Sequence, residues 1–165
     1  MSRQSGISAG TADNLQVDAG VLTIGITAAG ITRGVTTFAV ERTIREPEID
    51  GSPGPIKGTR RIVYEVARLT VTGLEWTSAL VDAAINGSAG SPAAYVIAAG
   101  THKDVTFVGK RADNQTITIT LNNCIAIDPG FSMEDNDEGG VSMTFEAHYS
   151  PSTMTTPPYT VAIGA

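Results

Sequence analysis

The sequence has few of the residues that usually carry catalysis or covalent cross-links. Its 165 residues include one cysteine, two histidines and only 5% aromatic residues. The single cysteine, Cys124, excludes a disulfide framework within the chain, which is compatible with a reducing compartment. With so few aromatic residues, a hydrophobic core must be built from Val, Ile, Leu and Ala.

Positive charge is also scarce, because 11 Lys and Arg face 17 Asp and Glu and the net charge is −6. Nucleic acid binds basic surfaces, where cations displace its condensed counterions, so this chain is not expected to grip DNA or RNA. No apolar run reaches the roughly 18 residues that span a bilayer. The polar start, "MSRQSGISAGTADNLQ", lacks the features of a signal peptide. We therefore expect a protein that is made in the cytoplasm and has no membrane partner.

Recognisable catalytic and ligand-binding motifs are missing as well. The sequence contains no nucleophile elbow, no Walker loop and no dinucleotide-binding glycine motif after a strand. His102 falls in a predicted turn and His148 on the polar face of the last predicted strand, and neither is linked to Cys124 or a serine. The acidic stretch "MEDNDEGG" fails as a calcium loop, because Gly139 occupies a position that needs an oxygen ligand. We expect an acidic turn there, and no catalytic residue, metal site or cofactor.

Strand-like alternation dominates what is present. Apolar and polar residues alternate over 34–46, 115–127 and 139–150, and the 18 glycines suit strands joined by tight turns. One short helix is predicted at 77–86, where Thr77 or Ser78 caps the start and Gly87 ends it. The expected fold is mainly β, a β-sandwich or barrel of about seven or eight antiparallel strands with one short α-helix.

This fold is expected to occupy one domain, residues 1–165. Three segments stand out in it: a flexible N-terminal arm at 1–14, a long hairpin loop at 46–58 and a C-terminal extension at 151–165. The residues expected in the core are Phe38, Val40, Leu69, Val71, Leu80, Ile119, Met143 and Phe145.

The hairpin around residues 40–69 has an unusual distribution of charge. Pro47, Pro53 and Pro55 are incompatible with a central strand, so the segment between the two strand-like runs is predicted to be a loop. Charged residues crowd the ends of both runs next to this loop. The returning run, 59–76, carries apolar residues on both faces, which predicts that something besides the chain's own core covers it.

The same stretch, "RGVTTFAVERTIREPEIDGSPGPIKGTRRIVYEVARLTVTGLEW", resembles the core of bacteriophage major tail proteins of the long, non-contractile type. The late segment "GGVSMTFEAHYSP" also resembles the final strand of that family, and together they cover roughly residues 15–150. The resemblance rests on the order and spacing of the following residues: Asp50, Gly51, Pro55, Lys57, Gly58, Arg61, Glu65, Ala67, Leu69, Val71, Leu74 and Glu75.

The resemblance implies a structural role without enzymatic activity. Such proteins form rings, usually hexameric, that stack into a tube, and each subunit adds strands to one barrel around the lumen. The hairpin loop would reach a neighbouring subunit, with the charges of 41–46 and 57–61 pairing across subunits and not within one. The implied interface residues are Asp50, Pro53, Pro55, Lys57, Arg60 and Arg61. The implied lumen-facing residues are Glu41, Thr43, Glu65 and Glu146.

The implied partners are further copies of the chain together with tape-measure, tail-tip and terminator proteins. DNA would pass through the lumen without specific binding, because an acidic wall repels phosphates. The implied location is the tail of a virion whose parts are made in the host bacterial cytoplasm.

Several other interpretations fit parts of the sequence. Contractile-tail tubes and type VI secretion tubes share the expected fold, and a connector or tail terminator is a further alternative. A carbohydrate- or peptide-binding β-sandwich would use aromatic platforms, for which only Trp76 and four tyrosines are available. A small β-barrel enzyme would need a pocket with convergent polar groups, which the scattered histidines and lone cysteine do not suggest.

Overall fold

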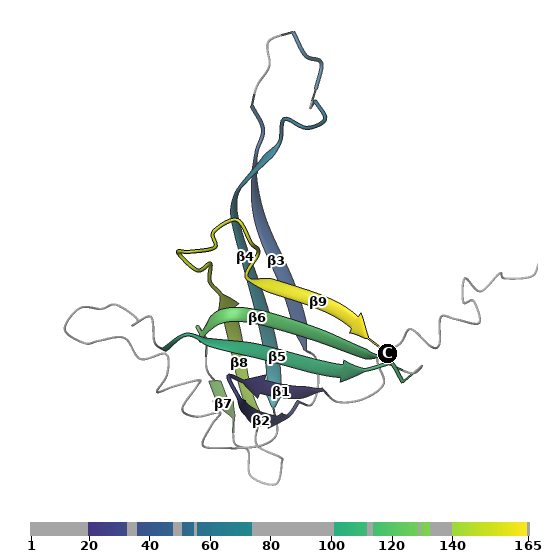
Figure 1. Ribbon diagram of the computed structural model, residues 1–165, viewed down its shortest axis with the longest axis vertical. Coiled ribbons are helices and arrows are strands. Elements are labelled where there is room, and N and C mark those ends of the chain that lie inside the picture. Colours follow the sequence, from purple (N-terminus) through teal and green to yellow (C-terminus); the bar gives the residue numbers. More distant parts are fainter. Residues whose placement is uncertain are drawn as a thin grey trace, which may run out of the picture.

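The computed structural model describes residues 20–32, 36–47, 51–54, 56–73, 101–111, 114–128, 130–132 and 140–164 (Figure 1). These residues form a mainly β, antiparallel fold, which confirms the expected fold class. The arm at 1–14, the predicted helix at 77–86 with Leu80, and the acidic turn at 134–138 lie outside the described residues. The nine described strands are β1 (Val21–Ile24), β2 (Thr27–Ile31), β3 (Thr37–Arg45), β4 (Arg61–Gly73), β5 (Lys103–Lys110), β6 (Thr116–Ala126), β7 (Gly130–Ser132), β8 (Gly140–Ala147) and β9 (Tyr159–Gly164).

The strands form one sheet that folds back on itself into two layers. Its order is β2-β1-β5-β6-β8-β4-β3, with β7 on β8 and β9 on β6. In Figure 1 the strands β3, β4 and β8 run across β1, β5, β6 and β9. We call β3, β4 and β8 the hairpin layer and β1, β2, β5, β6 and β9 the cross layer. Strand β6 links them, since it pairs with β5 and β9 and then, through residues 124–126, with β8.

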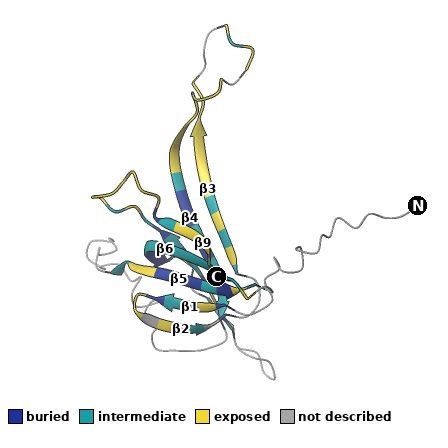
Figure 2. Ribbon diagram, turned by 45° about the vertical axis from the view of Figure 1, so that its right-hand side comes forward, coloured by how far each residue is buried: buried dark blue, intermediate teal, exposed yellow. Residues whose placement is uncertain are grey.

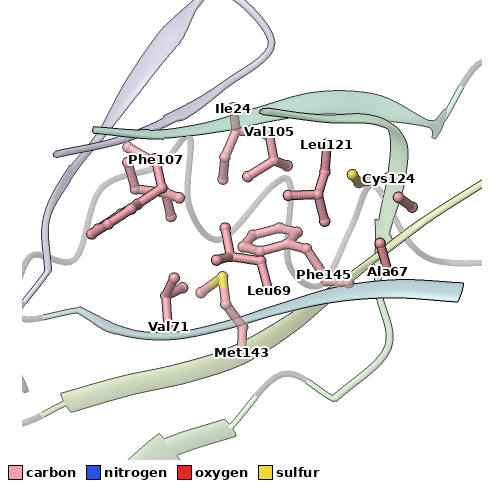
Figure 3. Close-up of a cluster of buried hydrophobic side chains, with 14 of the residues drawn as sticks. Ile24, Ala67, Leu69, Val71, Val105, Phe107, Leu121, Cys124, Met143 and Phe145 are labelled. Atoms are coloured by element: carbon pink, nitrogen blue, oxygen red, sulfur yellow. The ribbon is translucent and has the colours of Figure 1, made fainter. Parts of the chain in front are cut away.

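The core lies between these two layers. Side chains alternate between the faces of a strand, so every second residue of each layer points inward. Leu69, Val71, Met143 and Phe145 of the hairpin layer face side chains from β1, β5 and β6 (Figure 3), and all four are buried. The other described residues expected in the core, Phe38, Val40 and Ile119, are partly buried against this cluster. The expected core is therefore confirmed where it can be seen.

The β3–β4 hairpin extends well beyond the core. Its register runs from Thr37 opposite Thr70 to Arg45 opposite Arg61, with an irregularity between Thr43 and Ile44. Strand β4 pairs with β8 only over residues 68–73, so its first half has β3 as its one described strand neighbour. Figure 2 shows that the far ends of β3 and β4 are exposed while the near end of β4 is buried.

The predicted C-terminal extension, 151–165, contains strand β9. Its residues pair with β6 from Tyr159 opposite Leu121 to Gly164 opposite Thr116. Pro158, directly before β9, is buried, and the Asn122 amide donates to its carbonyl at 2.8 Å. The last strand is therefore fixed to the cross layer at its start, while most of its side chains remain exposed.

The start of the described chain is held by hydrogen bonds to Thr32 and by packing against Phe107 of the cross layer. The Gly20 amide donates to Thr32 Oγ1 at 3.2 Å, and the Thr32 hydroxyl donates back to the Gly20 carbonyl at 3.0 Å. A Cβ atom at Gly20 would lie 2.0 Å from Cε2 of the buried Phe107 ring. Only glycine leaves room for that ring.

Candidate assembly surfaces

The hairpin layer has a polar face on the side away from the core. Thr37, Thr70 and Thr144 are direct cross-strand neighbours on β3, β4 and β8, and the hydroxyls of Thr70 and Thr144 lie 3.0 Å apart. Thr72 and Ser142 form the next pair of this hydroxyl row. Since the opposite face of the same strands carries the core residues, this polar face is the surface that the layer can present to water or to a lumen.

One guanidinium joins two carboxylates across the polar face. Arg68 Nη1 donates to Glu41 Oε2 at 2.8 Å, and Arg68 Nε donates to Glu146 Oε2 at 2.9 Å. The hydrogen bond to Glu146 is the main cause that raises the pKa of Arg68 further above its ordinary value. With both carboxylates ionised, this network has one negative charge in excess. The polar face is therefore mildly acidic and mainly hydroxylic.

Three of the four residues expected to face a lumen share this polar face. Glu41 and Thr43 lie on it from β3, and Glu146 lies on it from β8. Glu65 does not join them, because it is opposite Arg42 and lies on the same face as the core residues Ala67 and Leu69. Whether any of the four lines a lumen stays a prediction.

Glu65 instead belongs to a polar network at the base of the projecting hairpin. Its carboxylate accepts hydrogen bonds from Arg42 and, at 3.2 Å, from the Tyr149 hydroxyl, and its side chain is only 7% exposed. Arg42 Nη2 also donates to the Tyr159 hydroxyl at 2.8 Å. We call Arg42, Glu65, Tyr149 and Tyr159 the base clamp, because they tie the C-terminal segment to β3 and β4.

The electrostatics of the base clamp follow from these contacts. The hydrogen bond from Arg42 lowers the pKa of Glu65 below its ordinary value. Burial raises the pKa of Tyr149, and the neighbouring Glu65 charge raises it further. The Tyr159 ring also contacts Phe38, with ring centroids 5.6 Å apart. Sequence reasoning missed this clamp because Tyr149 and Tyr159 lie more than 80 residues after Glu65 and no local pattern links them.

The residues expected at a subunit interface lie on the far part of the hairpin. Pro53, Lys57, Arg60 and Arg61 are exposed there, whereas Asp50 and Pro55 lie outside the described residues. The expectation that the charges of 41–46 and 57–61 pair across subunits and not within one is wrong for three pairs. Arg60 Nη2 lies 3.1 Å from Glu46 Oε2 of the same chain. Glu41 and Arg42 form the ion pairs with Arg68 and Glu65 described above. The register explains the Arg60–Glu46 pair, because Arg45 opposite Arg61 brings the next residues on each strand together.

Apolar side chains are exposed on the same part of the hairpin. Ile44, Ile62, Val63 and Tyr64 are each more than half exposed. The sequence predicted that both faces of β4 would be covered. In the described part of the chain, β4 is buried or partly buried from Val66 onward, while residues 61–64 stay exposed.

The histidines and the cysteine show little catalytic potential. His102 and His148 contact each other edge to face, with ring centroids 5.1 Å apart, and His148 Nε2 lies 3.6 Å from Glu146 Oε1. No local pattern predicts this contact between residues that lie 46 positions apart. Burial raises the pKa of the Cys124 thiol to about 12, so little nucleophilic thiolate exists at neutral pH.

In the described part of the chain, no helix has the length and apolar character to cross a membrane.

Comparison with known proteins identifies the fold. No family model and no curated protein matches the sequence. A solved structure of the anti-feeding prophage cap, described as a tube-terminating cap, is similar with a TM-score of 0.54 and 13% identity, over 96% of this chain and 100% of that chain. A chain of the sheath-tube complex of an extracellular contractile injection system (PVC, extended state) is similar with a TM-score of 0.51 and 14% identity, over 88% of both chains.

A chain of a gene transfer agent virion has a TM-score of 0.49 and 12% identity, over 88% of this chain and 95% of that one. At these identities the likeness concerns the fold alone. The fold of the chain is tail-tube-like, shared with chains of particles that contain tubes and caps.

Proposed function

We propose that the chain is a structural protein whose copies assemble into rings of six, and that these rings stack into a tube. The observation that carries the proposal is the division of the hairpin layer into a core face and a hydroxyl-rich polar face. Such a layer suits a barrel wall, in which the polar face lines the lumen and the other face is already covered by the cross layer. No enzymatic step is part of this proposal.

Free sheet edges support ring formation. Strand β3 ends the strand order, and no described strand pairs with its outer edge. Open edges invite uncontrolled pairing, and closing a sheet into a barrel removes them. If six copies each supply about four strands spaced about 4.8 Å apart, the circumference is about 115 Å and the backbone diameter about 37 Å before tilt. Strand tilt widens such a barrel, which leaves space for a nucleic-acid duplex.

The mild acidity of the polar face fits a conduit for DNA. Each subunit would present the Glu41–Arg68–Glu146 network with one negative charge in excess. Phosphates are repelled weakly by such a wall and find no free cation on this network to hold them. We propose that DNA passes through without specific binding, and that tape-measure, tail-tip and terminator proteins are the other partners in the tail of a virion made in the host bacterial cytoplasm.

Within this proposal we favour a long, non-contractile tail. The resemblance of residues 15–150 to major tail proteins of that type concerns the chain's own sequence, whereas the similar solved structures share only the fold. Electron microscopy of native particles tests the tail type. A tube without an outer layer is expected, and a sheath around the tube would contradict it.

A terminating cap is the second candidate, and the similarity to the anti-feeding prophage cap favours it. A cap stops after one ring, whereas a tube subunit adds ring upon ring. Negative-stain electron microscopy of the purified protein over a concentration series separates the two. Stacked rings or hollow filaments are expected. Single rings that never stack would favour the cap, and a monomer that persists with tail-tip components present would contradict both.

A further inference from the structure

Exposed apolar side chains gather in two places on the described surface. One group, the hairpin patch, consists of Ile44, Ile62 and Val63 at the far end of β3 and β4, while the exposed Tyr64 beside them pairs with Thr43 and lies on the polar face. The other, the β9 strip, consists of Val161 and Ile163, which are 51% and 62% exposed. Single exposed apolar residues are ordinary, but groups of them on neighbouring positions mark contact surfaces.

The β9 strip continues the core face of the cross layer into solvent. Val161 pairs with Ile119 and Ile163 pairs with Ile117, so these side chains lie on the same face as the fully buried Leu121. Burial decreases along this row, from Leu121 through the partly buried Ile119 to Ile163. The strip thus extends the core face to a place where no described strand covers it.

The hairpin patch also lacks a covering layer. Strands β3 and β4 pair with each other there, and β8 does not reach residues 61–67; Val66 and Ala67 are still buried, but residues 61–64 are exposed. The pairing irregularity beside Ile44 leaves Val63 without a direct partner on β3. The hairpin patch is therefore part of a two-stranded layer that no other described strand covers.

The two surfaces cannot satisfy each other within one chain. The described pairings join β9 only to β6, and β9 runs away from the projecting end of the hairpin in Figure 1. A second copy of the chain supplies both missing surfaces at once. We propose that the hairpin patch of one copy packs on the β9 strip of the next copy, as the missing second layer. This inference rests on the proposed tube function and specifies its receiving surface.

Charge favours the same arrangement. Residues 44–64 contain four of the 11 basic and three of the 17 acidic residues, so the hairpin is slightly basic. The rest of the chain has seven basic against 14 acidic residues. A basic projection is attracted to an acidic body, which speeds the encounter and disfavours contact between two hairpins.

Paired charge substitutions on the two faces of β9 test the surface. Val161→Glu with Ile163→Glu places two carboxylates on the strip, whereas Thr160→Glu with Ala162→Glu places the same charge on the opposite face of the same strand. All four side chains are exposed, so both variants should keep the melting temperature of the monomer. Sedimentation should show that the strip variant needs at least tenfold more protein to assemble, while the control assembles normally. Equal assembly of the two variants would overturn the proposal.

Disulfide trapping tests the partner. Val63→Cys and Ile163→Cys are made in separate preparations that carry tags of different size, mixed, allowed to assemble and oxidised. A mixed disulfide is expected, and Val63→Cys mixed with Thr160→Cys should give much less of it. The native Cys124 is buried and does not compete.

The outcomes of trapping separate this proposal from the function on which it rests. Rings that form with Val63→Cys linked only to itself, or with no mixed disulfide, would overturn the docking surface and leave the tube function standing. A wild-type chain that forms no rings would overturn both.

Discussion

The two halves of strand β4 differ sharply in environment although their sequences are similar. Leu69 and Val71 are almost completely buried between the two layers, whereas Ile62 and Val63, six to nine residues earlier, are more than half exposed. Both halves are rich in β-branched and aliphatic residues, so local composition does not cause the difference. The difference comes from the layers, because β8 and the cross layer cover one half and no described strand covers residues 61–64 of the other.

The largest expected effect on stability comes from truncating a core residue in the buried half of β4, and an exposed residue in the other half serves as the comparison. Leu69→Ala leaves a cavity in the core and should lower the free energy of unfolding by about 2–5 kcal/mol. Ile62→Ala removes an exposed side chain and should change the stability of the monomer by less than about 0.5 kcal/mol. Urea unfolding of the monomer measures both. Equal losses would show that the hairpin is already packed in the single chain.

Ile62→Ala, which should hardly change the stability of the monomer, should have a clear effect on assembly. Ile62→Ala is expected to weaken ring or filament formation measured by sedimentation, because the hairpin patch then offers less surface to a neighbour. A conservative Ile62→Val variant serves as its control. Assembly of Ile62→Ala at wild-type concentrations would remove the hairpin patch from the interface.

A second loss of stability is expected at the start of the described chain, far from the hairpin. Gly20→Ala places a methyl group where the Phe107 ring lies, so overpacking should cost about 1–3 kcal/mol. Thermal unfolding of the monomer measures it. Gly54→Ala, at an exposed loop position with open space around a new Cβ, is the matched control. Similar melting temperatures for both variants would contradict the close packing at Gly20.

A smaller effect is expected at the boundary between the two halves, where the base clamp lies. Because Arg42 lowers the pKa of Glu65 in the folded state, the ionised carboxylate stabilises the fold above its unfolded pKa. This contribution should disappear as pH falls below about 4.3, the ordinary value for Glu, and through the lower folded pKa. Since the Arg42 side chain is 46% exposed and solvent screens the pair from that side, Glu65→Gln should cost less than about 1 kcal/mol at pH 7.

Unfolding measured between pH 7 and pH 3 checks the base clamp. The wild type should lose its advantage over Glu65→Gln across the acidic range, and the two should converge at the low end. A constant difference over the whole range would mean that the Glu65 charge contributes nothing.

The smallest expected change in stability comes from the polar face. Glu41→Gln combined with Glu146→Gln leaves the Arg68 charge without a counter-charge, so the network changes from one negative to one positive charge per subunit. Assembled tubes of this variant should retain short DNA duplexes at low salt and release them as salt rises. Gel-shift or co-sedimentation measures the retention. Tubes that retain no more DNA than the wild type would show that this face does not meet the lumen.

The sequence predicted the parts of the fold that follow from local alternation. Leu69, Met143 and Phe145 were recognised because every second residue of their strands is apolar, and the structure buries them. The assignment of lumen candidates stays a prediction, but Glu65 does not share the polar face of the other three, since it lies on the core face with Leu69, where alternation alone already placed it. Glu65 was chosen because it is charged, but its position in the alternation of β4 indicates its face more reliably.

Contacts between distant segments could not be predicted. The base clamp joins residues 42 and 65 to residues 149 and 159, and the His102–His148 contact spans 46 positions. The pairing of β9 with the early part of β6 is equally non-local. These contacts depend on how the sheet folds back on itself, which periodicity within a single strand does not specify.

The hairpin patch and the β9 strip are different surfaces, and this asymmetry has a consequence for the whole particle. A contact between unlike surfaces is heterologous, so it repeats in one direction and gives every assembly a head and a tail. At one end hairpin patches remain unfilled, and at the other end β9 strips do. A growing tube built in this way is polar, and each end offers a different surface to whatever starts it or stops it.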